Sequence, residues 1–341
     1  MRSESVSTEV RVAPARPLVA VGIGALVVAA LIAVAFLAPG PALPTRLQDG
    51  LTLSISVLIE SLPFVILGVL LSIVVQVWVP AGAIERWMPR APWARRAVLS
   101  LLGMLIPVCE CGNVPFARGL MMRGLGVAET LTFLIAAPIV NPIVIITTHQ
   151  AFGFDDGILI ARLLGGYAVA NLIGWLYSRH PDPDGLITDR FRASCEISLE
   201  NAARGRGPGK AQQSLAQFVV ELRAVMPALV IGSALAGAVQ VLVPRSALLA
   251  IGSNPALSIV AMITLAMIVS ICSNVDAFFA LSFASTFTPG SIVAFLLVGP
   301  LVDVKMLALL RTTFRSKVLV GLVVIVVLFA VAVGSVVNLL A

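Results

Sequence analysis

Long uninterrupted runs of apolar residues constrain this chain more than any other feature of its sequence. Leu18–Leu37 and Leu51–Val79 each reach the length of roughly 20 residues that an α-helix needs to cross a bilayer core. Of all residues, 59% are hydrophobic and only 12% are charged, whereas soluble domains average about 25% charged residues. The runs are too long and too continuously apolar for the strands of a membrane barrel. The sequence therefore predicts an all-α, polytopic membrane protein surrounded by a lipid bilayer.

Basic loops explain the net charge of +6 better than a nucleic-acid partner does. No cluster of Lys and Arg is interleaved with aromatic residues, so no nucleic acid is expected to bind. Loops rich in Arg, such as Glu85–Arg96, are typical of the cytoplasmic side of a membrane protein. We therefore expect a multi-pass protein of the inner or plasma membrane, with its N-terminus in the cytoplasm.

The order of apolar and polar segments divides the chain into four parts. Residues 1–50 form an N-terminal tail and a first transmembrane helix, which we expect to be retained because no convincing cleavage site follows it. Residues 51–177 form a first membrane repeat. Residues 178–217 mix charges with Gly and Pro and form a polar cytoplasmic linker. Residues 218–341 form a second membrane repeat.

The two membrane segments resemble each other. Pro63–Pro80 aligns with Pro227–Pro244 without a gap and shares eight of 18 positions, including a Gln and both bounding prolines. Two shorter stretches also align, Cys111–Val114 with Cys272–Val275 and Pro138–Asn141 with Pro300–Asp303. The chain is therefore predicted to contain an internal duplication.

Loop charges favour opposite orientations for the two repeats. If the basic loops 80–97 and 311–317 are both cytoplasmic, the segment 97–122 must return to the side from which it entered. A broken, re-entrant hairpin would do this, because each limb is too short to cross about 30 Å at 1.5 Å per residue. The repeats would then be inverted, and their tips would meet near the bilayer midplane. If segments 97–122 and 256–287 are instead kinked single crossings, the repeats are parallel.

One short stretch places polar chemistry inside an apolar run. The stretch from Pro107 to Pro115 contains two thiols, a carboxylate, a glycine and an amide, namely Cys109, Cys111, Glu110, Gly112 and Asn113. Prolines break the helical hydrogen-bond ladder, and backbone freed at membrane depth persists only within protein or beside a water-filled cavity. Polar groups at that depth cost energy unless they form a site or have a partner. We expect a substrate-binding tip here, with Gly112 allowing the backbone to turn.

The second repeat offers an equivalent tip. Its candidate substrate-binding residues are Cys272, Asn274 and Asp276, and Asn141 and Asp303 lie at equivalent points, each three residues after a proline that would kink its helix. Unwound turns of this kind expose carbonyls and amides that can hold an ion or substrate. Helix packing is the alternative for Asn141, and pairing with Lys305 is the alternative for Asp303. The prolines expected to shape these turns are Pro107, Pro115, Pro138, Pro142 and Pro300.

Thiols suggest the class of substrate. Thiolates are soft donors, so Cys109, Cys111 and Cys272 are candidate ligands for a thiophilic metal or metalloid, while no resident cofactor is expected. A Cys-x-Cys motif alone is weak evidence, because buried Cys often acts as a small hydrophobe. Cys195 lies in the polar linker and is expected to be a bystander.

These motifs resemble a known family. Pro107–Pro115, Ala117–Leu120 and Ala136–Pro142 are similar to segments of the predicted permease family that includes the organoarsenical efflux permeases, and the likeness covers roughly residues 50–340. The resemblance implies an inner-membrane permease that exports trivalent organoarsenicals through contacts with cysteines. It nominates Cys109, Cys111 and Cys272. Many relatives have Ser where this chain has Glu110, and a fixed negative charge there favours a cation or proton coupling over a neutral organoarsenical.

We therefore expect a secondary transporter that exports a thiophilic metal, metalloid or small solute, with charge or proton coupling at Glu110, Asp276 and Asp303. An enzyme is not expected, because the sequence contains neither a nucleotide-binding loop nor a metalloprotease helix. One alternative is a transmembrane thiol–disulfide electron carrier that uses the midplane cysteines, although reactive pairs are better established as Cys-x-x-Cys. Another is a scaffold for a soluble partner at residues 178–217, which explains the linker but not the tips.

Overall fold

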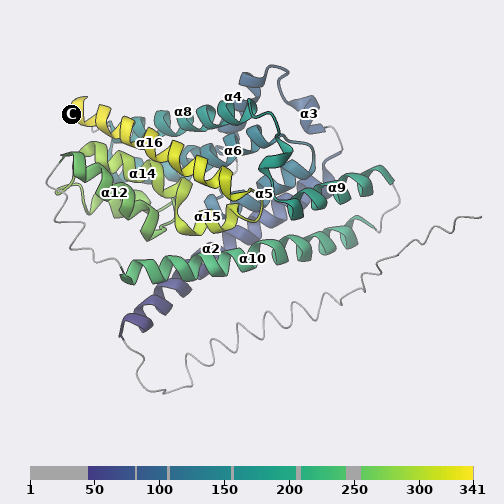
Figure 1. Ribbon diagram of the computed structural model, residues 1–341, viewed down its shortest axis with the longest axis horizontal. Helices are drawn as coiled ribbons and strands as arrows, with labels where there is room; N and C mark the ends of the chain where they lie inside the picture. The colour runs from purple at the N-terminus through teal and green to yellow at the C-terminus, as the bar shows by residue number, and fades with distance from the viewer. Residues whose placement is uncertain are drawn as a thin grey trace, which may run out of the picture. The chain divides into compact units, whose positions relative to one another are not determined.

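The protein is an all-α, polytopic membrane protein (Figure 1). The computed structural model describes residues 45–80, 83–105, 108–154, 157–204, 209–242 and 255–340. Two predicted features, the first transmembrane helix within residues 1–50 and the turn at Pro107, lie outside the described residues.

The helices follow one another in two groups joined by a linker. The first group contains α2 (Thr45–Ile73) with its π-helical extension η1 (Val74–Trp78), α3 (Ala83–Trp87), α4 (Pro92–Leu102), α5 (Glu110–Met122), α6 (Val127–Val140), α7 (Pro142–Phe152) and α8 (Ile158–Ser178). The linker contains η2 (Asp184–Leu186) and α9 (Asp189–Arg204). The second group contains α10 (Lys210–Leu242), α12 (Pro255–Val269), α13 (Asp276–Leu281), α14 (Pro289–Val302), α15 (Val304–Leu310) and α16 (Ser316–Leu340).

Five of the described helical stretches are long and apolar enough to cross a membrane. They are α2 with η1, α8, α10, α14 with α15, and α16, and a sixth is added if α6 and α7, which meet at a bend of 40°, count as one span. The helices α4 and α5 have 11 and 13 residues, so each is at most about 20 Å long and falls short of a bilayer core. Their length favours a re-entrant hairpin for the first tip.

Helices that align in sequence run antiparallel in space. The end of η1 lies beside the start of α10, where Lys210 Nζ is 5.0 Å from the centre of the Trp78 ring. The start of α2 lies beside the end of α10, where Ser54 Oγ donates to Ala234 O at 3.5 Å. This is the arrangement that inverted repeats would produce.

Two glycines allow α2 and α5 to touch. A Cβ atom added at Gly68 would lie 2.0 Å from the carbonyl oxygen of Gly112, and one added at Gly112 would lie 2.3 Å from Phe64 O. Small residues let membrane helices approach to backbone contact. Gly112 lies inside α5, so the expectation that it turns the backbone is wrong; it permits this close contact instead.

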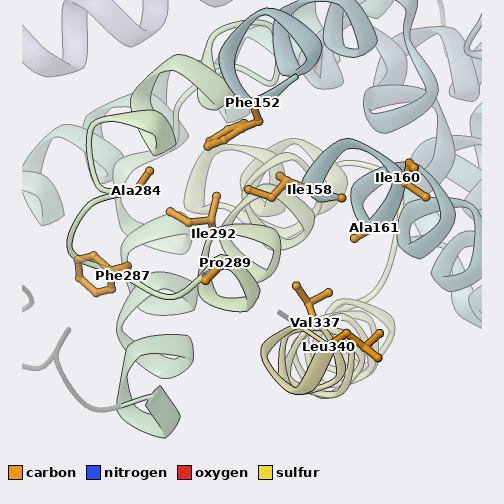
Figure 2. Close-up of a pocket in the computed structure, with 11 residues that line it drawn as sticks. Phe152, Ile158, Ile160, Ala161, Ala284, Phe287, Pro289, Ile292, Val337 and Leu340 are labelled. Carbon is orange, nitrogen blue, oxygen red and sulfur yellow. The ribbon is translucent and has the colours of Figure 1, made fainter. Parts of the chain in front are cut away.

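An apolar pocket of about 650 Å³ lies where α7, α8, α14 and α16 approach one another (Figure 2). Its wall includes Phe152 from α7, Ile158 from α8, Ile292 from α14 and Val337 from α16. None of the predicted thiol ligands lines this pocket.

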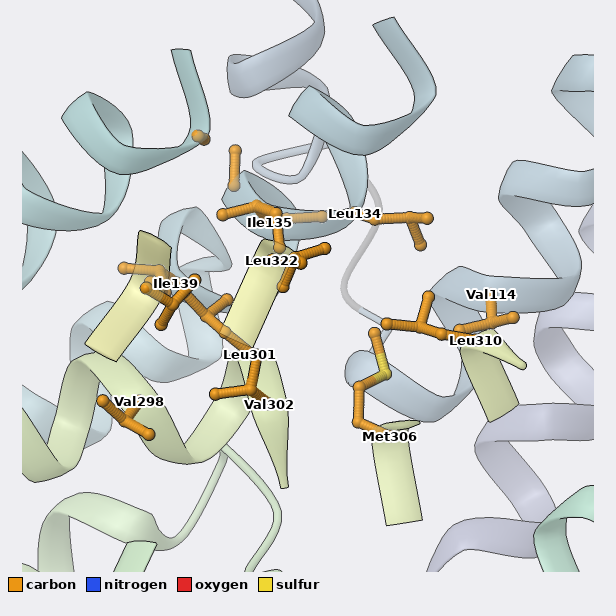
Figure 3. Close-up of a cluster of buried hydrophobic side chains, with 14 of the residues drawn as sticks. Val114, Leu134, Ile135, Ile139, Val298, Leu301, Val302, Met306, Leu310 and Leu322 are labelled. Atoms are coloured by element: carbon orange, nitrogen blue, oxygen red, sulfur yellow. The ribbon is translucent and has the colours of Figure 1, made fainter. Parts of the chain in front are cut away.

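The apolar core combines side chains from both halves of the chain (Figure 3). It includes Leu134, Ile135 and Ile139 of α6 together with Val298, Leu301 and Val302 of α14. Every residue of α6 is buried except Glu129, and so is every residue of α14 after Pro289. A helix that is hydrophobic all round belongs to the interior of a bundle. The two helices that end at Asn141 and Asp303 are therefore central.

Backbone hydrogen bonds connect the linker to the loop between α15 and α16. Ile187 and Phe314 form an antiparallel bridge, Thr188 N donates to Thr313 O at 2.9 Å, and Arg315 N donates to Leu186 O at 3.0 Å. The start of the linker and the basic loop 311–317 therefore lie on the same side. The helix α10 begins at Lys210, so the last residues of the predicted linker are helical.

The contact between α2 and α5 predicts a difference between two glycines. We expect Gly68→Ala to lower the thermal unfolding midpoint of the purified protein, because overpacking costs about 1–3 kcal/mol. The matched control is Gly299→Ala, where an added Cβ would meet only Ala266 Cβ at 3.9 Å. This control gains helix propensity and should leave the midpoint unchanged or raise it. Equal effects of the two substitutions would contradict the packing described here.

Candidate functional site

In each tip the backbone is not helical at a cysteine, and a helix begins just after it. In the first tip the backbone is extended at Cys109, whose carbonyl accepts from Gly112 N at 3.1 Å and Asn113 N at 3.2 Å as α5 begins. In the second tip Cys272 O accepts from Val275 N at 3.0 Å and from Asp276 N at 3.1 Å as α13 begins. By local conformation, Cys272 is thus the counterpart of Cys109, although the sequence alignment pairs it with Cys111.

Glu110 lies at the centre of the site. Its carboxylate is fully buried, with 0% relative exposure of the residue. Oε2 accepts from Ser273 Oγ at 2.9 Å and from Ser273 N at 3.5 Å, while Oε1 accepts from Lys305 Nζ at 3.4 Å. One side chain of the first tip therefore binds both the second tip and α15.

Three thiols gather around this carboxylate. Cys111 Sγ lies 4.0 Å from Glu110 Oε1, and Cys272 Sγ lies 3.9 Å from Glu110 Oε2. The side chain of Cys109 lies close to those of both Cys111 and Cys272. Ligand atoms of Cys109, Glu110 and Cys111 all lie within 4.8 Å of one another. Soft sulfur donors from both halves thus surround one carboxylate, a donor set that suits a thiophilic ion or metalloid.

The site is closed in this structure. Cys109, Cys111 and Cys272 have relative exposures of 1%, 0% and 2%, and all three are free thiols. A solute of any size therefore needs a rearrangement of the helices to reach them.

Asn141 and Asp303 occupy equivalent breaks. Asn141 separates α6 from α7 and accepts from Ile143 N at 2.9 Å, and Asp303 separates α14 from α15 and accepts from Met306 N at 2.5 Å. Both side chains therefore cap a helix N-terminus. Asn141 Nδ2 also donates to Val108 O at 3.2 Å, which holds the extended backbone of the first tip.

Three oxygens of predicted site residues remain unpaired. Asn113 Oδ1, Asn274 Oδ1 and Asp303 Oδ2 are buried and have no hydrogen-bond partner among the residues that the structure describes. Buried polar atoms normally have a hydrogen-bond partner, and an ion or a water is one explanation for an atom that lacks one.

Of the predicted turn prolines that the structure describes, only one begins a helix. Pro142 is the first residue of α7, a position that suits its missing N–H. Pro115 lies inside α5, so the expectation of a turn at this residue is wrong. Pro138 and Pro300 lie inside α6 and α14. The helices α6 and α14 nevertheless end two residues after their prolines.

A second ion pair joins the halves at α13. Arg162 of α8 donates from Nη1 to Asp276 Oδ1 at 3.0 Å and from Nη2 to Oδ2 at 2.6 Å, and Nη1 also donates to Thr148 Oγ1 at 2.7 Å. Asp276, predicted to bind substrate, is thus held by a buried guanidinium. Each tip helix carries in its first turn an acid that pairs with a cation of the other half: Glu110 with Lys305, and Asp276 with Arg162.

Sequence reasoning missed three members of this network. The sequence presents Lys305 only as a partner for Asp303 and gives no specific role to Arg162 or Ser61. In the structure Ser61 Oγ accepts from Cys111 Sγ at 3.7 Å. A signal for the cations was present, since an ionisable residue within a membrane span normally faces the interior and has a partner.

Cys195 lies on α9, apart from the tips. Burial raises the pKa of its thiol to about 11, so the thiol stays protonated and weakly reactive near neutral pH. It provides an internal control for the three tip cysteines.

The pair of Glu110 and Lys305 predicts strong coupling between two residues distant in sequence. We expect Lys305→Met or Glu110→Gln alone to destabilise the protein by about 3–5 kcal/mol, because each leaves a buried group without its partner. The double variant should lose less than the sum of the two single losses. Unfolding midpoints of the four proteins in detergent measure this cycle, and strictly additive losses would show that the two residues do not interact.

Comparisons with known proteins identify the family of this chain. Residues 46–339 match the family described as predicted permease. The chain is 36% identical over 278 residues to the UPF0718 protein YcgR of Bacillus subtilis (strain 168), covering 82% of this chain and 93% of that protein. It is 32% identical over 299 residues to a protein of Streptococcus mutans named putative two-component membrane permease complex subunit, covering 86% of this chain and 97% of that protein. No solved structure matches. This membrane protein belongs to the predicted permease family.

Proposed function

We propose that this permease is a secondary transporter that exports a trivalent metalloid compound, bound by Cys109, Cys111 and Cys272. The observation that carries the proposal is the convergence of three free, buried thiols from two broken helices. Two thiols can bind a trivalent dihydroxy organoarsenical by forming two arsenic–sulfur bonds, while each hydroxyl group leaves with a thiol proton as water. This exchange is neutral overall.

The ion pair in the site supports a neutral substrate. In the sequence, Glu110 counts against a neutral organoarsenical because it would present a fixed negative charge. In the structure its Oε1 lies 3.4 Å from Lys305 Nζ, so the charge is compensated. A neutral metalloid bound to the thiols would leave this pair intact, whereas a divalent cation would add charge beside Lys305.

Inverted repeats would supply the transport cycle. The antiparallel course of α2 and α10 and the pairing of each tip with the opposite half support an alternating-access mechanism. Glu110 and Asp276 pair across the halves and are then the groups that change partners when one half moves against the other, whereas Asp303 caps α15 within its own half. Proton coupling would act at these carboxylates.

The electron-carrier alternative is less well supported. The second tip carries a single thiol, Cys272, and the first tip has the spacing Cys-x-Cys rather than the better-established Cys-x-x-Cys of reactive pairs. Cys195 has a raised pKa and no second thiol beside it in the sequence. Transport rather than enzymatic electron transfer is therefore proposed.

A second protein component is also proposed. The Streptococcus mutans relative is named as a subunit of a two-component permease complex. In the present protein α9 has exposed positions on its outer face, for example Glu196 and Ile197, and the linker could therefore contact a soluble partner.

The thiol ligands are tested by a protection assay. In cells that lack arsenical efflux, expression of the wild-type protein should permit growth on methylarsenite, and Cys109→Ser, Cys111→Ser or Cys272→Ser should each abolish this protection. Cys195→Ser is the matched control and should protect fully, with equal protein in the membrane by immunoblot. Undiminished protection by the triple tip variant would refute the role of the thiols.

The proposed orientation is tested by labelling with a membrane-impermeant maleimide. In the Cys195→Ser background, Glu196→Cys reports on α9, and Phe154→Cys reports on the opposite end of α8. We expect intact cells to label Phe154→Cys and to label Glu196→Cys only after permeabilisation. The reverse pattern would place the linker outside the cytoplasm and invert the assigned topology.

A further inference from the structure

A polar cavity of about 420 Å³ lies on the linker side of the protein, away from the thiols. Its wall is formed by α5, the linker with α9, α10 and the turn after α15, which approach one another in Figure 1. Three arginines line it, Arg118, Arg190 and Arg311, together with the hydroxyl residues Thr188, Ser194 and Thr312. No carboxylate is among the described residues of the lining.

Arg118 lines the inner wall of this cavity, and its side chain is held in place by several contacts. The residue is 4% exposed; its Nε donates to Glu221 Oε2 at 3.0 Å, and its Nη1 donates to Thr312 O and Thr313 Oγ1, both at 3.2 Å. Its guanidinium carbon also lies 4.4 Å from the centre of the Phe191 ring. These contacts orient the guanidinium before any ligand arrives, and Glu221 compensates its charge.

Arg190 and Arg311 supply charge that is not compensated. Within the described parts of the chain neither guanidinium takes part in an ion pair, although Arg311 Nη1 donates weakly to Phe314 O at 3.4 Å. These two guanidinium groups line one cavity and are the donors that proteins use for phosphate and similar oxyanions. The hydroxyls of Thr188, Ser194 and Thr312 already donate to backbone carbonyls, so the arginines are the donors that a ligand would meet. The cavity volume exceeds that of a single phosphate group, so a larger phosphorylated molecule also fits.

We propose that this cavity binds the phosphate group of an anionic ligand, contacted by Arg190 and Arg311 against the wall formed by Arg118. The group belongs either to a soluble phosphate compound or to an anionic lipid at the membrane surface, since both present the same oxygens. The site is distinct from the thiol site and lies about 12 Å further along α5. It does not depend on which solute the thiols bind.

The experiment compares two charge-matched double variants in lipid nanodiscs. Arg190→Gln with Arg311→Gln removes the two uncompensated charges of the cavity. Arg179→Gln with Lys317→Gln removes two exposed charges that do not line the cavity. Unchanged thermal midpoints establish that both variants are folded.

Titration of inorganic pyrophosphate by calorimetry in phosphatidylcholine nanodiscs tests a soluble ligand. Native mass spectrometry from nanodiscs that contain phosphatidylglycerol tests a lipid. The proposal expects saturable binding in at least one arm, weakened at least tenfold, or about 1.4 kcal/mol, in the cavity variant and unchanged in the control. The arm that shows binding identifies the source of the phosphate. Absence of binding in both arms, or equal weakening in both variants, overturns the proposal.

Discussion

The site depends on one buried carboxylate of the first half of the chain, which contacts two residues of the second half. Glu110 of the first tip accepts from Ser273 of the second tip and pairs with Lys305 of α15. All these groups are buried away from water. The stability of the pair therefore depends on the geometry of its contacts. Removing one partner of a buried pair leaves an uncompensated charge, which is why such pairs fix one arrangement of the elements that carry them. The three thiols are brought together by the same contact.

The second ion pair supports the proposed inverted arrangement of the repeats. Asp276 opens α13 as Glu110 opens α5, and each acid reaches a cation of the opposite half. The helix breaks at Asn141 and Asp303 match in the same way, because each side chain caps the helix that follows. These correspondences, together with the antiparallel course of α2 and α10, support the proposed duplication. Two crossed ion pairs would also offer two points at which one half can release the other during transport.

Much of the fold follows from local sequence patterns. Hydropathy indicates the spans, because a helix must satisfy its own backbone in lipid, and the Pro-x-x-Asn and Pro-x-x-Asp patterns locate the breaks near Asn141 and Asp303. The polar tips are also visible, since thiols and acids stand out in apolar runs. What could not be predicted is the rotation of each helix about its axis. That rotation brings Lys305 rather than another residue to Glu110, and it gives Gly112 a packing role.

The same limit applies to the charge of Glu110. Read along the chain, Glu110 is an isolated acid in lipid, and its partner is 195 positions away. Spacing along one helix carries no information about such a contact. The arginine-lined cavity was missed for the same reason, because its residues come from α5, α9 and the turn after α15. Pairing across the two halves is therefore the property that only a three-dimensional structure supplies.

The meeting of the two tips is the central claim, and a cross-linking measurement tests it directly. A protease site placed between Arg204 and Gly209 would separate the halves, in a variant that keeps only Cys109 and Cys272. The account predicts that mild oxidation in the membrane forms a disulfide between these thiols, so that the cut halves migrate together until reductant is added. Halves that separate after complete loss of free thiols would contradict it, because the thiols would then have reacted with other partners.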